Sequence, residues 1–223
     1  MKKAIGFSIC LLALSLTVQA VTVTGRVQVM GRAGKTKVTT IVYAEPLDRQ
    51  QVQSGTFSMS QRNTTFSPAV LPVPAGSVVK FPNDDSIFHN VFSLSRPGPF
   101  DLGLYRAGAS QSRTFSTPAV YRIFCNIHPQ MSAVVLVLPT AYFVEADSMG
   151  RYRLDLPSGR YRVTAWSDRA PQTSSEITVA ANPLNAVDLM LDESRYVQVE
   201  HKNKMGQDYP LIAYDPLNER RIR

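Results

Sequence analysis

The chain has 223 residues, of which 44% are hydrophobic, and a formal net charge of +7. This length is enough for one large domain or two small ones, each with its own core. The positive charge falls to +5 without Lys2 and Lys3, and no block of lysine and arginine is present that could follow a phosphate backbone. We therefore expect no nucleic-acid partner.

Residues 1–20 have the pattern of a secretory signal peptide. A basic start, MKK, precedes an apolar run from Ala4 to Val18, and small residues at 18 and 20 suit a signal peptidase. The run is too short for a membrane span and nothing comparable follows it. We expect a mature chain that begins near Val21, without a transmembrane segment. The lysine-led signal favours a bacterial periplasm, although an extracellular location would give the same pattern.

Most of the mature chain predicts β-strands. Alternating or continuous apolar runs separated by proline, glycine and asparagine are typical of an all-β sandwich or barrel. The predicted strands are 21–29, 37–44, 78–81, 90–94, 120–124 and 132–138, then 176–180 and 186–191. The prolines and glycine of 72–76 predict a turn, and 101–108 could form one helical turn.

The segment GRYRLDLPSGRYRV, residues 150–163, repeats Gly-Arg-Tyr-Arg around a Pro-Ser-Gly turn. This pattern predicts a β-hairpin. By alternation, one side carries Tyr152, Leu154, Tyr161 and Val163, and the other side carries four arginines. The arginines could dock an acidic partner, but the solvated outer face of a sandwich explains them more simply.

A metal site is predicted from the sulfur and imidazole side chains. The mature chain keeps one cysteine, Cys125, which begins the motif C-x2-H-x2-M with His128 and Met131, and His89 lies 36 residues upstream. A thiolate, two imidazoles and a thioether are the set that binds copper in a trigonal plane with a weak axial methionine. Zinc is conceivable from Cys and two His, but methionine is a poor zinc ligand.

Residues 54–139 resemble a cupredoxin of the plastocyanin and amicyanin type. The resemblance is carried by 66–71, 73–81, Asn83-Asp84, His89-Asn90-Val91 and 121–131. It implies a Greek-key β-sandwich with one type 1 copper per chain, bound by His89, Cys125, His128 and Met131. It also implies that Asn90 ties the ligand-bearing segments together, with its backbone N–H reaching the thiolate.

The resemblance further implies where electrons leave. His128 would be the more exposed ligand, with its ring edge at a surface bounded by residues such as Ile87, Ile127 and Pro129. Redox protein partners would then dock near His128.

Residues 21–45 and 141–191 resemble a carboxypeptidase regulatory-like, or transthyretin-like, β-sandwich. The resemblance is carried by VTGRV, TTIVYAEP and the segment 147–163. Because the first two blocks lie far from the third, we infer that the cupredoxin is inserted into this sandwich; two consecutive domains are the alternative. The combined pattern is similar to methylamine-utilisation-like exported proteins. The polar tail, 192–223, could form an extra strand or bind a partner.

These observations favour an electron carrier rather than an enzyme. Four protein ligands leave no position for a substrate, and a single further histidine, His201, is too few for a multicopper oxidase or a nitrite reductase. A dinuclear copper-A centre needs two cysteines. The alternative is a copper-binding sensory or delivery module in which the second sandwich docks a partner.

Overall fold

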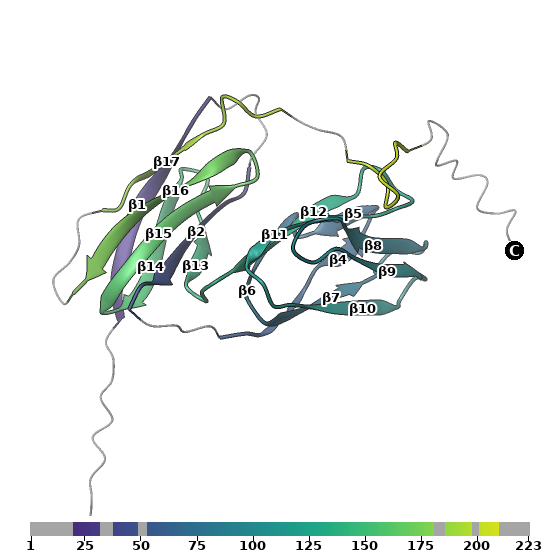
Figure 1. Ribbon diagram of the computed structural model, residues 1–223, viewed down its shortest axis with the longest axis horizontal. Coiled ribbons are helices and arrows are strands. Elements are labelled where there is room, and N and C mark those ends of the chain that lie inside the picture. Colours follow the sequence, from purple (N-terminus) through teal and green to yellow (C-terminus); the bar gives the residue numbers. More distant parts are fainter. Residues whose placement is uncertain (1–19, 32–37, 49–52, 181–185, 198–200, 210–223) are drawn as a thin grey trace, which may run out of the picture.

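The computed structural model describes residues 20–31, 38–48, 53–180, 186–197 and 201–209. All the regular secondary structure within these residues is β-strand, and the strands form two sandwiches (Figure 1). The all-β prediction is confirmed. No described helix is long and apolar enough to cross a membrane. The predicted signal peptide, apart from Ala20, lies outside the described residues.

One sandwich is built from two separate stretches of the chain, and we call it the split sandwich. Its sheets have the strand orders β14-β1-β17 and β13-β2-β15-β16. The strands are β1 (Ala20–Met30), β2 (Thr40–Pro46), β13 (Phe143–Glu145), β14 (Arg151–Pro157), β15 (Gly159–Ser167), β16 (Ala170–Val179) and β17 (Leu189–Asp192). An apolar core that includes Val23, Leu156 and Val163 lies between the two sheets.

The other sandwich, which we call the middle sandwich, lies between these stretches in the sequence. Its main sheet has the order β6-β12-β11-β8-β9 and faces the sheet β10-β7-β3, with β4 and β5 paired beside them. The strands are β3 (Thr56–Ser58), β4 (Ser60–Arg62), β5 (Thr65–Ser67), β6 (Val70–Pro74), β7 (Ser77–Pro82), β8 (His89–Ser93), β9 (Phe100–Tyr105), β10 (Ser110–Phe115), β11 (Ala119–Phe124) and β12 (Ser132–Leu138).

Two local predictions in the middle sandwich are wrong. Residues 100–105 form β9 instead of a helical turn, and 70–74 form β6 instead of part of a turn. Both strands lie at the edges of the five-stranded sheet, where each has one strand neighbour. An edge strand tolerates proline and exposed polar residues, so the apolar alternation that identifies an inner strand is weak there.

The prediction of a hairpin at 150–163 is also wrong. β14 pairs antiparallel with β1, from Ala20↔Pro157 to Arg26↔Arg151, whereas β15 lies between β2 and β16. The Pro-Ser-Gly turn therefore carries the chain from one sheet to the other. The predicted sides are confirmed, because the tyrosines and aliphatic residues are buried and the arginines are exposed. The arginines form surface ion pairs with carboxylates such as Asp147 and Glu176.

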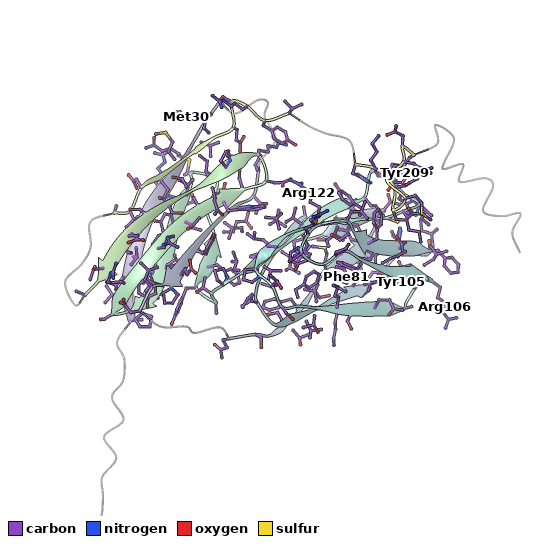
Figure 2. All side chains as sticks on the ribbon, in the orientation of Figure 1. Met30, Phe81, Tyr105, Arg106, Arg122 and Tyr209 are labelled. Carbon is purple, nitrogen blue, oxygen red and sulfur yellow. The ribbon has the colours of Figure 1, made fainter. Side chains whose placement is uncertain are left out.

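β12 joins the two sandwiches, because both of its faces are buried. Ala133, Val135 and Val137 face the core of the middle sandwich. Val134, Leu136 and Leu138 instead pack with residues of β2 and with Trp166 of β15 in a third cluster, which we call the shared cluster. This explains the continuous apolar run of this strand. Arg122, labelled in Figure 2, adds an ion pair to Asp168 at 2.8 Å across the same boundary.

Candidate metal centre

The candidate donors lie at one end of the five-stranded sheet. His89 is the first residue of β8, and Cys125 directly follows β11, the neighbour of β8. The short connection from β11 to β12 carries His128 and Met131, and we call residues 125–131 the ligand loop. It is closed on itself, because the Met131 N–H donates to the His128 carbonyl at 3.0 Å and the Cys125 N–H to the Met131 carbonyl at 3.3 Å.

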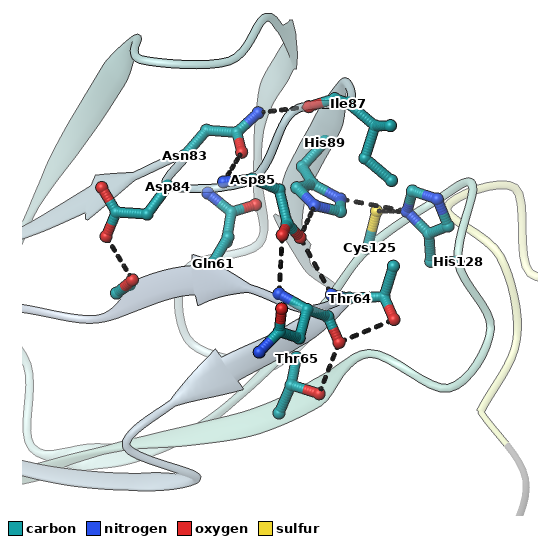
Figure 3. Close-up of polar contacts among 12 residues, drawn as sticks. Gln61, Thr64, Thr65, Asn83, Asp84, Asp85, Ile87, His89, Cys125 and His128 are labelled. Atoms are coloured by element: carbon teal, nitrogen blue, oxygen red, sulfur yellow. Dashed lines mark hydrogen bonds and ion pairs between the residues drawn. The ribbon is translucent and has the colours of Figure 1, made fainter.

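Three donor atoms converge at this end of the sheet (Figure 3). His89 Nδ1 lies 3.0 Å from His128 Nδ1, and Cys125 Sγ lies 3.5 Å from His128 Nδ1. One ligand atom from each of the three residues lies within 4.8 Å of the others, and all three side chains are fully buried.

The spacing of these atoms suits a first-row metal ion. Metal–nitrogen bonds of about 2.0–2.1 Å and a metal–sulfur bond of about 2.3 Å would place the three donors of a trigonal plane roughly 3.5–3.8 Å apart. The distance between the two Nδ1 atoms and the distance from Cys125 Sγ to His128 Nδ1 each need to increase by about half an ångström or less to reach these values. Because both histidines present Nδ1, the donor set matches the His2Cys plane of blue-copper sites.

The Cys125 sulfur is surrounded by N–H donors. The backbone N–H of Asn90 donates to it at 3.5 Å, and the N–H groups of Ile127 and His128 also bond to it. Burial raises the pKa of the Cys125 thiol, while these N–H donors partly offset the effect of burial. The thiol therefore keeps its proton until a metal ion displaces it, and the thiolate then formed finds three donors in place.

His128 is held in its neutral form. Burial and the neighbouring His89 lower its pKa to about 4, although the Asp85 carboxylate acts in the opposite direction. A neutral imidazole is the form that binds a metal.

The prediction that the His128 ring edge reaches the surface is wrong in this structure, because the side chain is fully buried. Residues 201–209 cover the ligand loop, and their ribbon passes beside His128 in Figure 3. A polar stretch near the end of a sequence carries no signal that it will fold back onto a loop formed much earlier in the chain.

The outer nitrogen of His89 contacts a carboxylate that the sequence did not identify. Asp85 Oδ2 lies 2.7 Å from His89 Nε2. Since the Asp85 carboxylate accepts a hydrogen bond there, Nε2 carries the hydrogen and Nδ1 presents its lone pair to the other ligand atoms. Asp85 also accepts the backbone N–H groups of Asn63 and Thr64, at 2.6 and 2.9 Å.

These contacts keep Asp85 ionised. Burial alone would raise the pKa of its carboxyl, but hydrogen bonds from Thr64, His89 and Asn63 more than offset burial and lower the pKa. The sequence signal for this role was an acidic residue four positions before a candidate ligand. Asp85 was not recognised because it lies among the turn residues 82–85, where acidic residues are common.

Asn90 does part of what the resemblance implies. Its backbone N–H bonds to the sulfur of the ligand loop, but its side chain amide donates to Asp101 Oδ1 and to the Gly103 carbonyl, at 2.7 and 2.8 Å. It thus ties β8 to the ligand loop through the backbone and to β9 through the side chain. Met131 is fully buried in the same core cluster as Cys125, and its part as fourth ligand stays a prediction.

Comparisons with known proteins find similarity to cupredoxins over part of the chain. No protein-family profile matches. Amicyanin-alpha of Methylorubrum extorquens (strain ATCC 14718 / DSM 1338 / JCM 2805 / NCIMB 9133 / AM1) is 28% identical over 91 residues, which make up 40% of this chain and 76% of that relative. This similarity supports an amicyanin-like cupredoxin domain and does not extend to the identity of the split sandwich.

Two solved structures also match in part. A purple cupredoxin from Nitrosopumilus maritimus is 26% identical with a TM-score of 0.34, over 36% of this chain and 98% of that one. A copper-containing nitrite reductase from Thermus scotoductus is 27% identical with a TM-score of 0.35, over 36% of this chain and 22% of that one. Both TM-scores are low, so we base no functional conclusion on these two structures.

Proposed function

We propose that this chain is an exported blue copper protein that carries single electrons between redox partners. The proposal rests on the convergence of His89 Nδ1, His128 Nδ1 and Cys125 Sγ in a buried position. Two imidazoles and a thiolate are the in-plane donors of type 1 copper sites. A bound copper ion would supply one-electron exchange between Cu(I) and Cu(II).

In this proposal the chain holds one copper ion per molecule. His89, Cys125 and His128 would hold the ion, and Met131 would add a weak thioether ligand. Asn90 donates its backbone N–H to the sulfur, and Asp85 fixes the orientation and the tautomer of His89. The N–H donors stabilise the negative charge on sulfur, so they favour thiolate binding at neutral pH.

The burial of the donors supports a carrier rather than an enzyme. All four proposed ligand side chains are fully buried, so a substrate has no approach to the donor atoms in the described structure. The donors are also fixed by neighbouring strands and by hydrogen bonds within the ligand loop. A site that changes little between the two oxidation states suits rapid electron exchange.

The alternative is a copper-binding sensory or delivery module in which the split sandwich docks a partner. The shared cluster favours a permanent function for the split sandwich, because it joins the two sandwiches through buried apolar side chains. The burial of the donors argues against delivery, since a site that transfers its ion has to expose its ligands to an acceptor.

We further propose that the middle sandwich, residues 54–139, is a cupredoxin inserted into a carboxypeptidase regulatory-like sandwich formed by 21–45 and 141–191. The pairing of β1 with β14 and of β2 with β15 supports this arrangement. We propose a periplasmic location from the signal peptide pattern. Redox protein partners would dock near His128, on the side that residues 201–209 cover.

The test is to add Cu(II) to the copper-free mature protein. We expect an intense visible thiolate-to-copper band, an EPR spectrum with narrow hyperfine splitting, and a reversible one-electron wave in voltammetry. Cys125→Ser should abolish the band. A colourless product, or a blue protein that survives this substitution, would refute the type 1 assignment. Rapid loss of copper to a chelator without reversible voltammetry would favour delivery.

A matched pair of methionines tests the axial position. Met131 and Met59 are both fully buried in the core of the middle sandwich, and only Met131 lies in the ligand loop. Met131→Leu should shift the reduction potential and the visible spectrum, whereas Met59→Leu should leave both unchanged. If the two variants have the same reduction potential and the same visible spectrum, Met131 is not a copper ligand.

A further inference from the structure

Residues 201–209 lie on the ligand loop although they are more than seventy residues away in the sequence, and we call them the cap. The Tyr209 hydroxyl donates to the Cys125 carbonyl at 2.9 Å, and the Lys204 N–H donates to Asn126 Oδ1 at 3.0 Å. The His201 ring bonds through Nε2 to the Pro129 carbonyl. The cap therefore contacts the ligand loop on both sides of His128. Tyr209 marks its position at one end of the molecule in Figure 2.

The cap is also fixed to the sheet that carries the other donors. Lys204 Nζ lies 2.7 Å from Asp101 Oδ2, and the other oxygen of Asp101 accepts the Asn90 side chain. Asn90 in turn donates its backbone N–H to Cys125 Sγ. The His201 ring stacks on Phe124 with centroids 4.2 Å apart. A continuous set of contacts thus runs from the cap to the sulfur.

The cap has a structure of its own, unlike a simple tail. Asn203 Oδ1 accepts the backbone N–H groups of Met205 and Gln207, and Lys202 forms an ion pair with Asp208 within the cap. These bonds define a compact turn whose Tyr209 and His201 are side by side, with a hydroxyl to Nδ1 distance of 3.4 Å.

Polar contacts, rather than an apolar core, hold the cap in place. Met205, its one large aliphatic side chain, is 72% exposed and contributes no buried anchor. Segments with few buried apolar contacts belong to the least stable parts of a protein and open locally, without global unfolding. Opening the cap breaks a small number of hydrogen bonds and one stacking contact, and it uncovers the ligand loop around His128.

We propose that the cap gates electron exchange: while it is closed it keeps reagents and partners from His128, and exchange proceeds when it opens. This inference rests on the proposed function, since it assigns the cap a role at that copper site. Oxidation of the reduced protein then moves one electron to the acceptor only from the open form. The rate follows the fraction of molecules that are open.

The first test needs no copper. In the copper-free mature protein Cys125 is the single thiol, so its rate of labelling by a maleimide measures opening. Tyr209→Phe removes one hydrogen bond to the ligand loop, and each bond lost should raise the labelling rate about fivefold. A combined variant, His201→Ala with Lys204→Ala and Tyr209→Phe, loses three side-chain contacts and should raise the rate roughly a hundredfold.

The second test uses the copper-loaded full mature chain and hexacyanoferrate(III), which accepts one electron per reduced protein. The same variants should accelerate the return of the visible band in the same order. Met205→Ala is the matched control, because the Met205 side chain is 72% exposed and contributes no buried anchor, while the backbone N–H that Asn203 accepts is kept. It should change neither rate.

The outcomes separate the two proposals. Unchanged labelling in Tyr209→Phe and in the combined variant would overturn the gate, whatever the copper does. Faster labelling with slower oxidation would also overturn it, because electrons would then pass through the closed cap. If the parent protein binds no copper but labelling responds as expected, the cap is a real cover and the proposed function fails by itself.

Discussion

The two sandwiches use the same alternation of inward and outward side chains, but they differ in what they bury. The core of the split sandwich contains two buried tyrosines, and each hydroxyl donates to a backbone carbonyl, at 2.5 Å for Tyr152 and 2.9 Å for Tyr161. The middle sandwich buries two imidazoles and a thiol whose donor atoms point at one another. A buried polar group is ordinarily satisfied by the fold, and three ligand atoms gathered within 4.8 Å of one another form a group that could hold a metal ion.

Backbone conformation shows the same contrast. In the described part of the split sandwich, the positive φ angles belong to Gly31, Gly150 and Gly159. Among the described residues, the non-glycine residues with positive φ are Asn63 and Thr64, both at 53°, and both donate to Asp85 beside the candidate metal centre. Strained backbone therefore occurs where it positions a site, and the split sandwich has the features of a scaffold.

The largest expected effect tests whether the two sandwiches are independent. Leu136 lies in the shared cluster, so Leu136→Ala should lower the free energy of unfolding by about 2–5 kcal/mol. It should also change the fluorescence of Trp166, the one tryptophan in the sequence, which lies in the same cluster. Urea denaturation followed by tryptophan fluorescence and by the copper band provides the measurement.

The control for this prediction is Leu156→Ala. The same atoms are deleted from the core of the split sandwich, away from the shared cluster. A comparable loss of stability is expected, with native-state fluorescence unchanged. If Leu136→Ala leaves the free energy of unfolding unchanged, the contact between the two sandwiches does not contribute to their stability.

The next effect concerns the carboxylate behind His89. Asp85→Asn keeps an oxygen that accepts a hydrogen bond but removes the negative charge, and we expect copper affinity to fall roughly 10–100-fold. Asp84→Asn is the control, since the Asp84 carboxylate accepts the Ser60 hydroxyl, whereas Asp85 is the carboxylate that contacts His89. Competition with a Cu(I) chelator measures both. Equal affinities for the two variants would make Asp85 a structural carboxylate only.

The three ligand atoms that converge belong to residues that the sequence identified, His89, Cys125 and His128, because their types and spacing are unusual, while Met131 as a ligand stays a prediction. Cys125, His128 and Met131 are local to one loop, and the alternation at 90–94 and 120–124 predicted the strands β8 and β11. The cap was not accessible, because its role depends on contacts between distant segments. Asp85 lies only four residues before His89, but the sequence did not distinguish it from the other turn residues of 82–85. The failure at β14 and β15 has the same origin: a turn motif defines a reversal of the chain but not which sheet each strand joins.

A smaller effect is expected when the split sandwich loses one polar contact. Tyr152→Phe leaves the Val187 carbonyl without its donor, and we expect a loss of about 1–2 kcal/mol in unfolding free energy. The copper band and the reduction potential should not change, because the hydroxyl belongs to the scaffold. A shifted reduction potential would contradict the interpretation that the split sandwich is a scaffold without influence on the copper site.

The smallest effect tests the backbone strain beside the candidate metal centre, and the substitution is expected to stabilise the protein. Asn63 and Thr64 form the two-residue loop between β4 and β5, where Arg62 pairs with Thr65. Positive φ at both positions is the geometry of a type I′ turn, which prefers Asn-Gly. Thr64→Gly should therefore stabilise the protein by about 0.5–1 kcal/mol after the entropy of glycine is deducted.

The neighbouring threonine supplies the control, because the structure gives it no positive φ. Thr65→Gly should destabilise β5 by about 0.5–1 kcal/mol, the opposite sign for the same change one residue away. Thr64→Gly keeps the backbone N–H that Asp85 accepts, so copper affinity should stay the same. If both glycines destabilise the protein, the turn stores no strain. The carboxylate beside His89 is then held by hydrogen bonds alone.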